Sequence, residues 1–488
     1  MESSSIFTGE SHIKCCTYLA RPHLYFQNDM LGFCCKALSN FNPNAPRFPY
    51  LDTATETIVN FLHKRVIILA ELNGISPIDI AKACADCDKL GTYPKDNNNK
   101  VKHINISCYP SVCNAKCIYC SVYTNPKNTF DSTKHSRYPK MISEIISWLQ
   151  SEDLIEDNAS VVIAPAEITI MPHKDLLLDS IARYKANFLS NGFIFDQKIA
   201  DTMKRNGSQL MVSIDSGTRE TFKFVKGLDL FEKVKANLKK YKIYGNITIK
   251  FIVIAGVNDS NNDLDGIIDI VCSLGIRNLH TSFEYGLPLR SAFFSLTKLI
   301  DKLDNNGLSF SFHAVYSPEQ IRDAKEQYIT SDSIISYEKN LSSLRSAVNA
   351  DFIDDYKSYR RYAFYMEIKF LLMHFKSNIR FALLGFVEKD QYIIFAFEKL
   401  GIPLLAPNVS YEESFELVKD YADVFIIRSK EEVEAVKSYM ESADCNSNRL
   451  LDIERYYYSF EPARLYLERH IAKEFLQEAE LIAEADNG

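Results

Sequence analysis

The chain has 488 residues, of which 46% are apolar and 24% are charged, and its formal net charge is −7. These proportions are ordinary for a globular protein, and the length allows about three domains of roughly 150 residues each. The acidic balance disfavours a large nucleic-acid footprint. No apolar run approaches the roughly 18 residues that a membrane span requires, so we expect no membrane partner.

The N-terminus, from Met1 to Ile6, contains neither a basic region nor an apolar stretch. This pattern is not that of a signal peptide, so we expect the chain to be cytoplasmic. In a reducing compartment, twelve cysteines indicate metal or redox chemistry rather than disulfides.

Residues 1–97 form a cysteine-rich region. Two short apolar pieces, at 24–26 and 31–33, resemble strands, and residues 55–72 have the apolar spacing of an amphipathic helix. The cysteines occur as two adjacent pairs and one C-x2-C motif: Cys15 and Cys16, Cys34 and Cys35, and Cys84 and Cys87. One thiolate from each pair and two from the motif make four. Four thiolates suit either an iron–sulfur cluster or a structural zinc ion.

The most informative motif is the C-x3-C-x2-C run of Cys113, Cys117 and Cys120. Three thiolates are one fewer than a fully protein-ligated four-iron cluster takes, and an open coordination position is typical of a catalytic metal site. A zinc loop is the alternative at this point, with His103 or Cys108 as a fourth ligand.

Strand-like and helix-like segments alternate from residue 101 onward. Strands are predicted at 101–108, 160–164, 210–215, 247–255 and 279–283, with a short one ending at Ser190-Asn191-Gly192. Helices are predicted at 141–149, 176–184, 230–241 and 264–274, with one opened by Asp196. Six strand–helix units in order predict parallel pairing with right-handed crossovers.

The cysteine triplet, Tyr119 before its last cysteine, and the six units together resemble the radical S-adenosylmethionine (SAM) superfamily, over about residues 100–290. The resemblance implies a partial (βα)6 TIM-like barrel at 98–325, part of an overall α/β fold. It also implies a [4Fe–4S] cluster on the three cysteines whose free iron binds SAM. With this context, iron is favoured over zinc. The N-terminal cysteines similarly resemble a SPASM- or twitch-like auxiliary-cluster module, although such modules usually follow the barrel.

The resemblance also assigns the SAM-binding positions. Glu167 corresponds to a carboxylate that binds the SAM amino group, but Ala164, Pro165 and Ala166 replace a glycine-rich backbone, and proline cannot adopt positive φ. The other implied cofactor-binding residues are Tyr119, Ser190, Asn191, Ser213, Asp215 and Gly256. Ser213 and Asp215 also fit a turn or helix cap.

After the sixth strand, Glu284 and Tyr285 stand where a substrate would meet the barrel. They are our candidate catalytic residues, as substrate contacts or proton-transfer groups. The alternative is that they belong to the barrel wall.

The C-terminal third is divided into a helical connector (326–376), a Rossmann-like βαβ module (377–440) and an acidic helical tail (441–488). A dinucleotide fingerprint needs three glycines in G-x-G-x-x-G, and only Gly385 is in place. We therefore predict a substrate-docking or partner module rather than a dinucleotide site.

The resemblance implies an enzyme that generates a 5′-deoxyadenosyl radical to modify a peptide, sugar or cofactor precursor. It implies an external electron donor such as ferredoxin or flavodoxin and a small-molecule or peptide substrate. Two alternatives remain: a non-catalytic iron–sulfur or zinc protein, and an RNA-modifying radical SAM enzyme.

Overall fold

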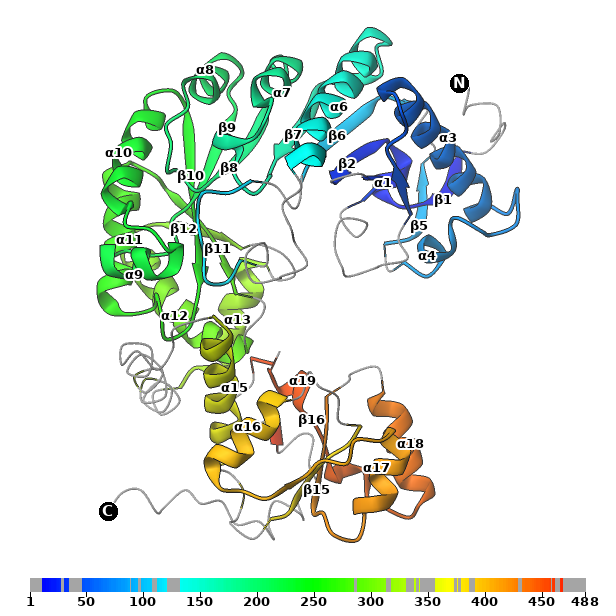
Figure 1. The fold of residues 1–488 in the computed structure, drawn as a ribbon, viewed down its shortest axis with the longest axis vertical. Coiled ribbons are helices and arrows are strands. Elements are labelled where there is room, and N and C mark those ends of the chain that lie inside the picture. The colour runs from blue at the N-terminus through cyan, green and yellow to red at the C-terminus, as the bar shows by residue number, and fades with distance from the viewer. Residues whose placement is uncertain are drawn as a thin grey trace. The chain divides into compact units, whose positions relative to one another are not determined.

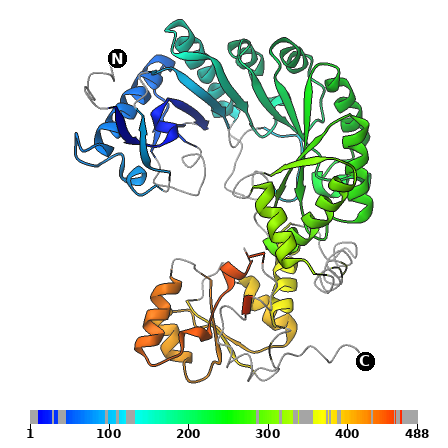
Figure 2. The same cartoon turned by 180° about the vertical axis from the view of Figure 1, so that it is seen from behind.

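The computed structural model (Figures 1 and 2) describes residues 11–27, 30–34, 46–87, 89–94, 98–107, 112–120, 132–284, 288–312, 317–330, 338, 342, 356–372, 375, 379–385, 391–428, 432–457, 459–460 and 466–467. The chain divides into two compact units. The first comprises residues 1–214, 222–250 and 270–276, and the second comprises residues 215–221, 251–269 and 277–488. No helix in the described segments is long and apolar enough to cross a membrane.

The largest element is a ten-stranded sheet in the order β12, β11, β10, β9, β8, β7, β6, β2, β3, β4. Its strands are β2 (His23–Gln27), β3 (Met30–Gly32), β4 (Arg47–Pro49), β6 (Val101–Ile106), β7 (Ile155–Ile163), β8 (Ala186–Ser190), β9 (Gln209–Ser213), β10 (Asn246–Val253), β11 (Asn278–Phe283) and β12 (Ser309–Phe312). Each strand from β6 to β10 pairs in parallel with the next, which confirms the predicted parallel α/β core. The sheet continues with β12, parallel to β11, which the sequence did not predict.

Helices connect these strands: α6 (Ser132–Ser151), α7 (Lys174–Ser180), α8 (Gln197–Asn206), α9 (Arg219–Lys226), α10 (Phe231–Lys242), α11 (Asn261–Ser273), α12 (Leu289–Asn305) and α13 (Pro318–Tyr328). Helices α6, α7 and α8 lie along one face of the strands (Figure 1). Asp196 caps α8 as predicted, because its side chain accepts a hydrogen bond from Ile199 N at 3.0 Å. Along β6, Ile104 and Ile106 are fully buried, and His103 and Asn105 alternate with them on the opposite face.

The N-terminal segment extends the main sheet. Strand β2 pairs in parallel with β6, with His23 opposite His103, and β3 and β4 follow in antiparallel pairing. A separate two-stranded sheet joins β1 (His12–Cys15) to β5 (Gly91–Pro94). The predicted helix is present as α3 (Ala54–Leu72), which begins with a capping box of Thr53 and Glu56. The short helices α1 (Thr17–Ala20) and α4 (Lys82–Ala85) carry parts of the cysteine pattern.

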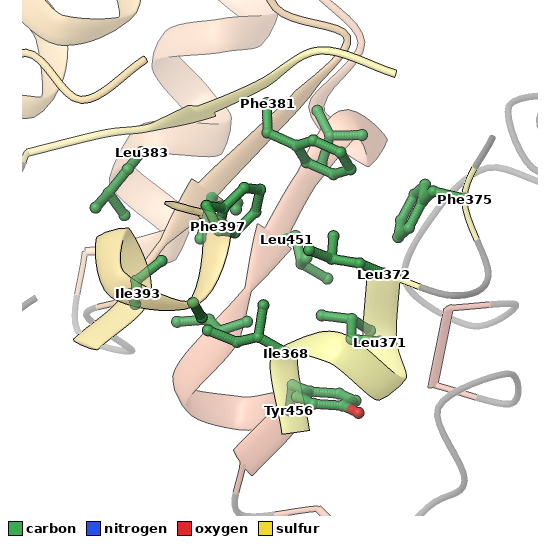
Figure 3. Packing of buried hydrophobic residues seen from close by; sticks show 14 of the residues in the cluster. Ile368, Leu371, Leu372, Phe375, Phe381, Leu383, Ile393, Phe397, Leu451 and Tyr456 are labelled. Carbon is green, nitrogen blue, oxygen red and sulfur yellow. The ribbon is translucent and has the colours of Figure 1, made fainter. Parts of the chain in front are cut away.

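The C-terminal part contains a second sheet in the order β14 (Leu404–Leu405), β13 (Phe381–Leu383), β15 (Val424–Ile427), β16 (Leu450–Asp452), with all pairs parallel. The helices of this part are α15 (Tyr356–Leu372), α16 (Gln391–Leu400), α17 (Tyr411–Val418), α18 (Val433–Ser442) and α19 (Ile453–Tyr457), and it also contains the 3-10 segment η4 (Ser447–Arg449). A second 3-10 segment, η2 (Ile168–Ile170), lies in the first unit. Figure 3 shows α15, α16 and the sheet meeting in one core around Ile368, Phe397 and Leu451.

Because β16 pairs with β15, this sheet continues past the predicted boundary at residue 440. In the region predicted as a helical tail over 441–488, η4 and β16 follow α18, and the part beyond residue 460 lies almost entirely outside the described residues. After β13, Gly385 has φ of +59°, and a Cβ there would lie 2.5 Å from the Tyr411 ring. An aromatic ring thus covers the turn that phosphates approach in dinucleotide-binding folds.

Candidate functional site

The loop of Cys113, Cys117 and Cys120 follows β6 and is held by backbone hydrogen bonds to the C-terminus of α9. Lys116 N donates to Lys226 O at 2.9 Å and Ile118 N donates to Val225 O at 3.0 Å. The last carbonyls of a helix have no partner within the helix, so the loop satisfies two of them. The local sequence did not reveal this contact, because over a hundred residues separate the two segments.

Gly227, directly after α9, makes this approach feasible. Its φ is +71°, and a Cβ at this position would lie 2.8 Å from the Cβ of Lys116 and 3.0 Å from its carbonyl oxygen. Positive φ suits glycine, and the absence of a side chain admits the cysteine loop.

We expect Gly227→Ala to displace the cysteine loop and lower its capacity to retain iron. Gly207→Ala is the matched control, because Gly207 has φ of +69° but no atom within 4 Å of the point where a Cβ would lie. Both variants carry the left-handed strain of about 1–2 kcal/mol, and only Gly227→Ala adds the clash. Iron content after anaerobic reconstitution and the unfolding midpoint should therefore fall further for Gly227→Ala, and equal losses in both variants would show that the contact is unimportant.

The three thiols lie close enough to interact electrostatically. Burial, with Glu167, Cys117 and Cys120 acting in the same direction, raises the pKa of Cys113 to about 11. Two donors point toward the Cys113 sulfur: Ala115 N at 3.4 Å and the Asn191 side-chain amide at 3.8 Å. Such donors stabilise a thiolate or a metal-bound sulfur, and hydrogen bonds to sulfur tune iron–sulfur clusters.

Among the described residues, no group of three or more His, Cys, Asp or Glu side chains is arranged to hold one metal ion. A [4Fe–4S] cluster has a different geometric requirement, since each of its cysteines binds a separate iron atom. The soft thiol set on one short loop, with donors directed at its sulfur, fits an iron–sulfur cluster.

Glu167 is fully buried, and its carboxylate joins two turns. Its Oε1 accepts hydrogen bonds from Thr169 N at 3.0 Å, Thr169 Oγ1 at 2.7 Å and Ser190 Oγ at 2.8 Å. Its Oε2 accepts from Asn191 N at 2.7 Å. Glu167 caps η2 and fixes the end of β8, and Oε2 accepts one hydrogen bond whereas Oε1 accepts three.

Asn191 connects this carboxylate to the cysteine loop. Its side-chain amide donates to Asn114 Oδ1 at 2.7 Å, and its Oδ1 accepts from Phe193 N at 2.9 Å. The structure therefore brings three of the predicted cofactor residues, Glu167, Ser190 and Asn191, into one hydrogen-bonded network beside Cys113.

A buried lysine that the sequence did not single out lies on the other side of the loop. Lys226 is 1% exposed, and its Nζ donates to Tyr119 Oη at 3.3 Å and to Ser213 Oγ at 3.4 Å. The ammonium also stands 5.8 Å from the centre of the Tyr119 ring, within the range of a cation–π contact. Two predicted residues, Tyr119 and Ser213, thus share a cation. The sequence signal that could have drawn attention to Lys226 is its place directly before Gly227, since a basic residue followed by glycine is typical of a helix C-terminus.

The described part of the second unit contains three further predicted residues. Asp215 is fully buried with φ of 56°, and its Oδ1 accepts from Ile252 N at 2.7 Å. Gly256 N donates to Asp259 Oδ2 at 3.0 Å. These contacts brace the backbone after β9 and β10. Glu284 is 9% exposed and follows β11, whereas Tyr285 lies outside the described residues.

The N-terminal cysteines form a second group in the first unit. Burial, with Cys16, Cys34, Cys87 and Glu71 acting in the same direction, raises the pKa of Cys84 to about 12, so these four thiols lie near enough to interact electrostatically. Cys15, in contrast, is fully buried within β1, which leaves Cys16 as the accessible member of its pair. Cys35 lies outside the described residues.

Comparison with known proteins identifies the barrel. Residues 109–271 match the family model of the radical SAM superfamily. No curated protein matches the chain. Among solved structures, SuiB of Streptococcus suis bound to S-adenosylmethionine is 13% identical, with a TM-score of 0.37, over 66% of this chain and 76% of that one.

Two other similar structures have comparable scores. Native anSMEcpe with bound AdoMet is 17% identical, with a TM-score of 0.35, over 43% of this chain. TYW1 with a lysine-pyruvate adduct is 18% identical, with a TM-score of 0.28, over 44% of this chain and 73% of that one. The chain spans 63% of the length of anSMEcpe.

Proposed function

We propose that this radical SAM enzyme, whose residues 109–271 match the superfamily, binds a [4Fe–4S] cluster on Cys113, Cys117 and Cys120 and uses it to modify a peptide, sugar or cofactor precursor. When bound, such a cluster supplies the electron that cleaves SAM into methionine and a 5′-deoxyadenosyl radical, which takes a hydrogen atom from the substrate. The observation that carries the proposal is the support of the three-thiol loop by α9 and by Asn191.

The residues around the loop have separate roles in this proposal. Lys226 provides a buried positive charge for the SAM carboxylate, and Ser213 and Tyr119, its hydrogen-bond partners, orient it. Glu167 Oε2, which accepts one hydrogen bond in the structure, would accept another from the ammonium of SAM. Asp215 and Gly256 are assigned to cofactor binding, and Glu284 and Tyr285 to substrate contact or proton transfer.

The accessory parts are assigned by their chemistry. Cys16, Cys34, Cys84 and Cys87, with Cys35 as an alternative to Cys34, would hold a second [4Fe–4S] cluster; the alternative is a zinc ion, for which the described thiols are not arranged around one point. An external electron donor such as ferredoxin or flavodoxin reduces the enzyme in the cytoplasm. We assign the C-terminal sheet to docking a substrate or partner rather than to binding a dinucleotide. Tyr411 covers the turn at Gly385, which is the turn that the phosphates of a dinucleotide would approach.

The direct test is anaerobic reconstitution of the full chain, followed by reduction with dithionite in the presence of SAM. We expect about four iron atoms per cluster and the formation of 5′-deoxyadenosine, measured by chromatography. A chain that holds the cluster, binds SAM and yields no 5′-deoxyadenosine would contradict the proposal.

Lys226→Met tests the proposed carboxylate contact. Methionine keeps most of the buried side-chain volume and removes the charge, so we expect SAM to bind about tenfold more weakly, as loss of a charge-assisted hydrogen bond predicts, with iron content unchanged. Lys223→Met is the control, since Lys223 is an exposed lysine of the same helix. Equal SAM affinity in both variants, measured by equilibrium dialysis, would assign Lys226 a structural role only.

A further inference from the structure

A groove of about 640 Å³ lies in the first unit, and its described lining includes no residue of the cysteine loop. Six residues that line it carry the argument: Tyr18, His23, Tyr25, Lys102, His103 and Ser160. We call it the imidazole groove.

The sheet register builds this groove. His23 of β2 pairs with His103 of β6, which pairs with Ser160 of β7. Neighbouring strands place such partners side by side on one face. This is also the face that carries Asn105, opposite the buried Ile104 and Ile106.

The aromatic rings form a continuous wall. The His23 and His103 ring centres are 5.4 Å apart, and the Tyr25 ring lies 5.5 Å from that of His103. The Tyr18 ring meets His23 edge-on at 5.3 Å. Such a wall offers apolar faces to a flat or aliphatic body.

The imidazole nitrogens retain hydrogen-bonding capacity. His103 Nδ1 lies 2.7 Å from Ser160 Oγ, which leaves Nε2 for another group. The Nδ1 atom of His23 is buried and has no hydrogen-bond partner among the described residues. Neutral imidazole presents one donor and one acceptor, so a ligand in this groove would find both.

The charge of the groove favours an anion. Burial lowers the pKa of His23 to about 4, with His103, Lys102 and Arg65 acting in the same direction, and burial also lowers the pKa of His103. The rings are therefore neutral near pH 7. Arg21 is paired with Glu156 at 3.1 Å. Lys102 lines the groove beside a register shift between Val101 and His103, is exposed, and makes no ion pair within the described residues. The unbalanced charge is positive.

We propose that the imidazole groove binds an organic anion, with Lys102 and the two imidazoles holding a carboxylate or phosphate and the aromatic wall holding the attached carbon skeleton. His103, Asn105 and Ser107 point to the same face of β6 and its extension and span about 13 Å at roughly 3.3 Å per residue toward the cysteine loop. The anion is thus the non-reacting end of the substrate, an assignment that rests on the proposed function. Binding energy from such a remote group can position the reacting carbon.

The test is an NMR titration of the full chain labelled at histidine Cε1, at pH 7 without SAM or reductant. Benzoate and phenyl phosphate are the anionic probes, and benzylammonium is the cationic one. We expect the anions to shift the His23 and His103 signals, which His23→Asn and His103→Asn assign, and the cation to leave them unchanged. The tighter of the two anions identifies the group as carboxylate or phosphate.

Lys102→Gln should weaken anion binding about tenfold, as loss of a charged hydrogen-bond partner implies. Lys239→Gln, an exposed lysine on α10, and His63→Asn, an exposed histidine on α3, should leave it unchanged. Equal binding of benzylammonium, or no effect of Lys102→Gln, would overturn the proposal. The titration needs no SAM chemistry, so its failure and a failure to form 5′-deoxyadenosine are separate results.

Discussion

Alanine substitution of Cys113, Cys117 or Cys120 is expected to remove about four iron atoms from the reconstituted chain and to reduce 5′-deoxyadenosine formation to background. Each thiol would supply one bond to a different iron of the cluster. The described part of the loop contains no further cysteine, so no other thiol there can replace the one that is removed. Alanine is preferable to serine because a serine hydroxyl can still ligate a metal.

Cys272→Ala is the matched control. Cys272 is exposed, and it lies on α11, so its loss should leave iron content and activity unchanged. Elemental analysis separates iron from zinc at the same time. A triplet variant that keeps both its iron and its SAM cleavage would place the catalytic cluster elsewhere, most directly on the group of Cys16, Cys34, Cys84 and Cys87.

The local pattern predicted the barrel strands well because burial alternates within each segment. The strand predicted at 210–215 is present as β9 with alternating burial, and Asp196 caps α8 as expected. These features depend on residues only a few positions apart.

The sequence did not predict features that depend on distant partners. Leu24 and Phe26 were assigned to a separate cysteine-rich region, but β2 extends the barrel sheet because it pairs with β6. Lys226 resembled an ordinary basic residue at a helix end, and only the fold shows that it is buried against Tyr119. The sequence did not predict the imidazole groove either, because His23 and His103 become neighbours only through the pairing of β2 with β6.

Glu167 also has a role beyond the one that the resemblance implied. It was predicted as a ligand for the SAM ammonium, and that assignment stays a prediction. The structure shows in addition that its carboxylate accepts four hydrogen bonds. The run Ala164-Pro165-Ala166 lacks the glycines that the resemblance implies. The turn that follows it is instead held by the side chain of Glu167.

Replacing Glu167 should therefore damage stability as well as cofactor binding. Glu167→Gln keeps the shape but presents an amide N–H₂ to donors on one side. At least one buried donor then loses its acceptor, at a cost of about 1–3 kcal/mol. Glu167→Ala removes the acceptor from all four donors, so its loss of unfolding free energy should be larger. Because Asn191 links Glu167 to Asn114, both variants should also retain iron less well.

Denaturant unfolding of the iron-free chain measures the first effect, and iron content after reconstitution measures the second. Glu144→Gln is the control, since Glu144 is an exposed residue of α6 whose contact with Lys140 spans 3.8 Å, and exposed pairs contribute about 0–1 kcal/mol. If Glu167→Gln were as stable as this control and kept full iron content while SAM binding fell, the carboxylate would act on the cofactor alone. A loss of stability in the iron-free chain, larger in Glu167→Ala than in Glu167→Gln, would show that the same carboxylate holds the β8 turn beside the cysteine loop before any cofactor binds.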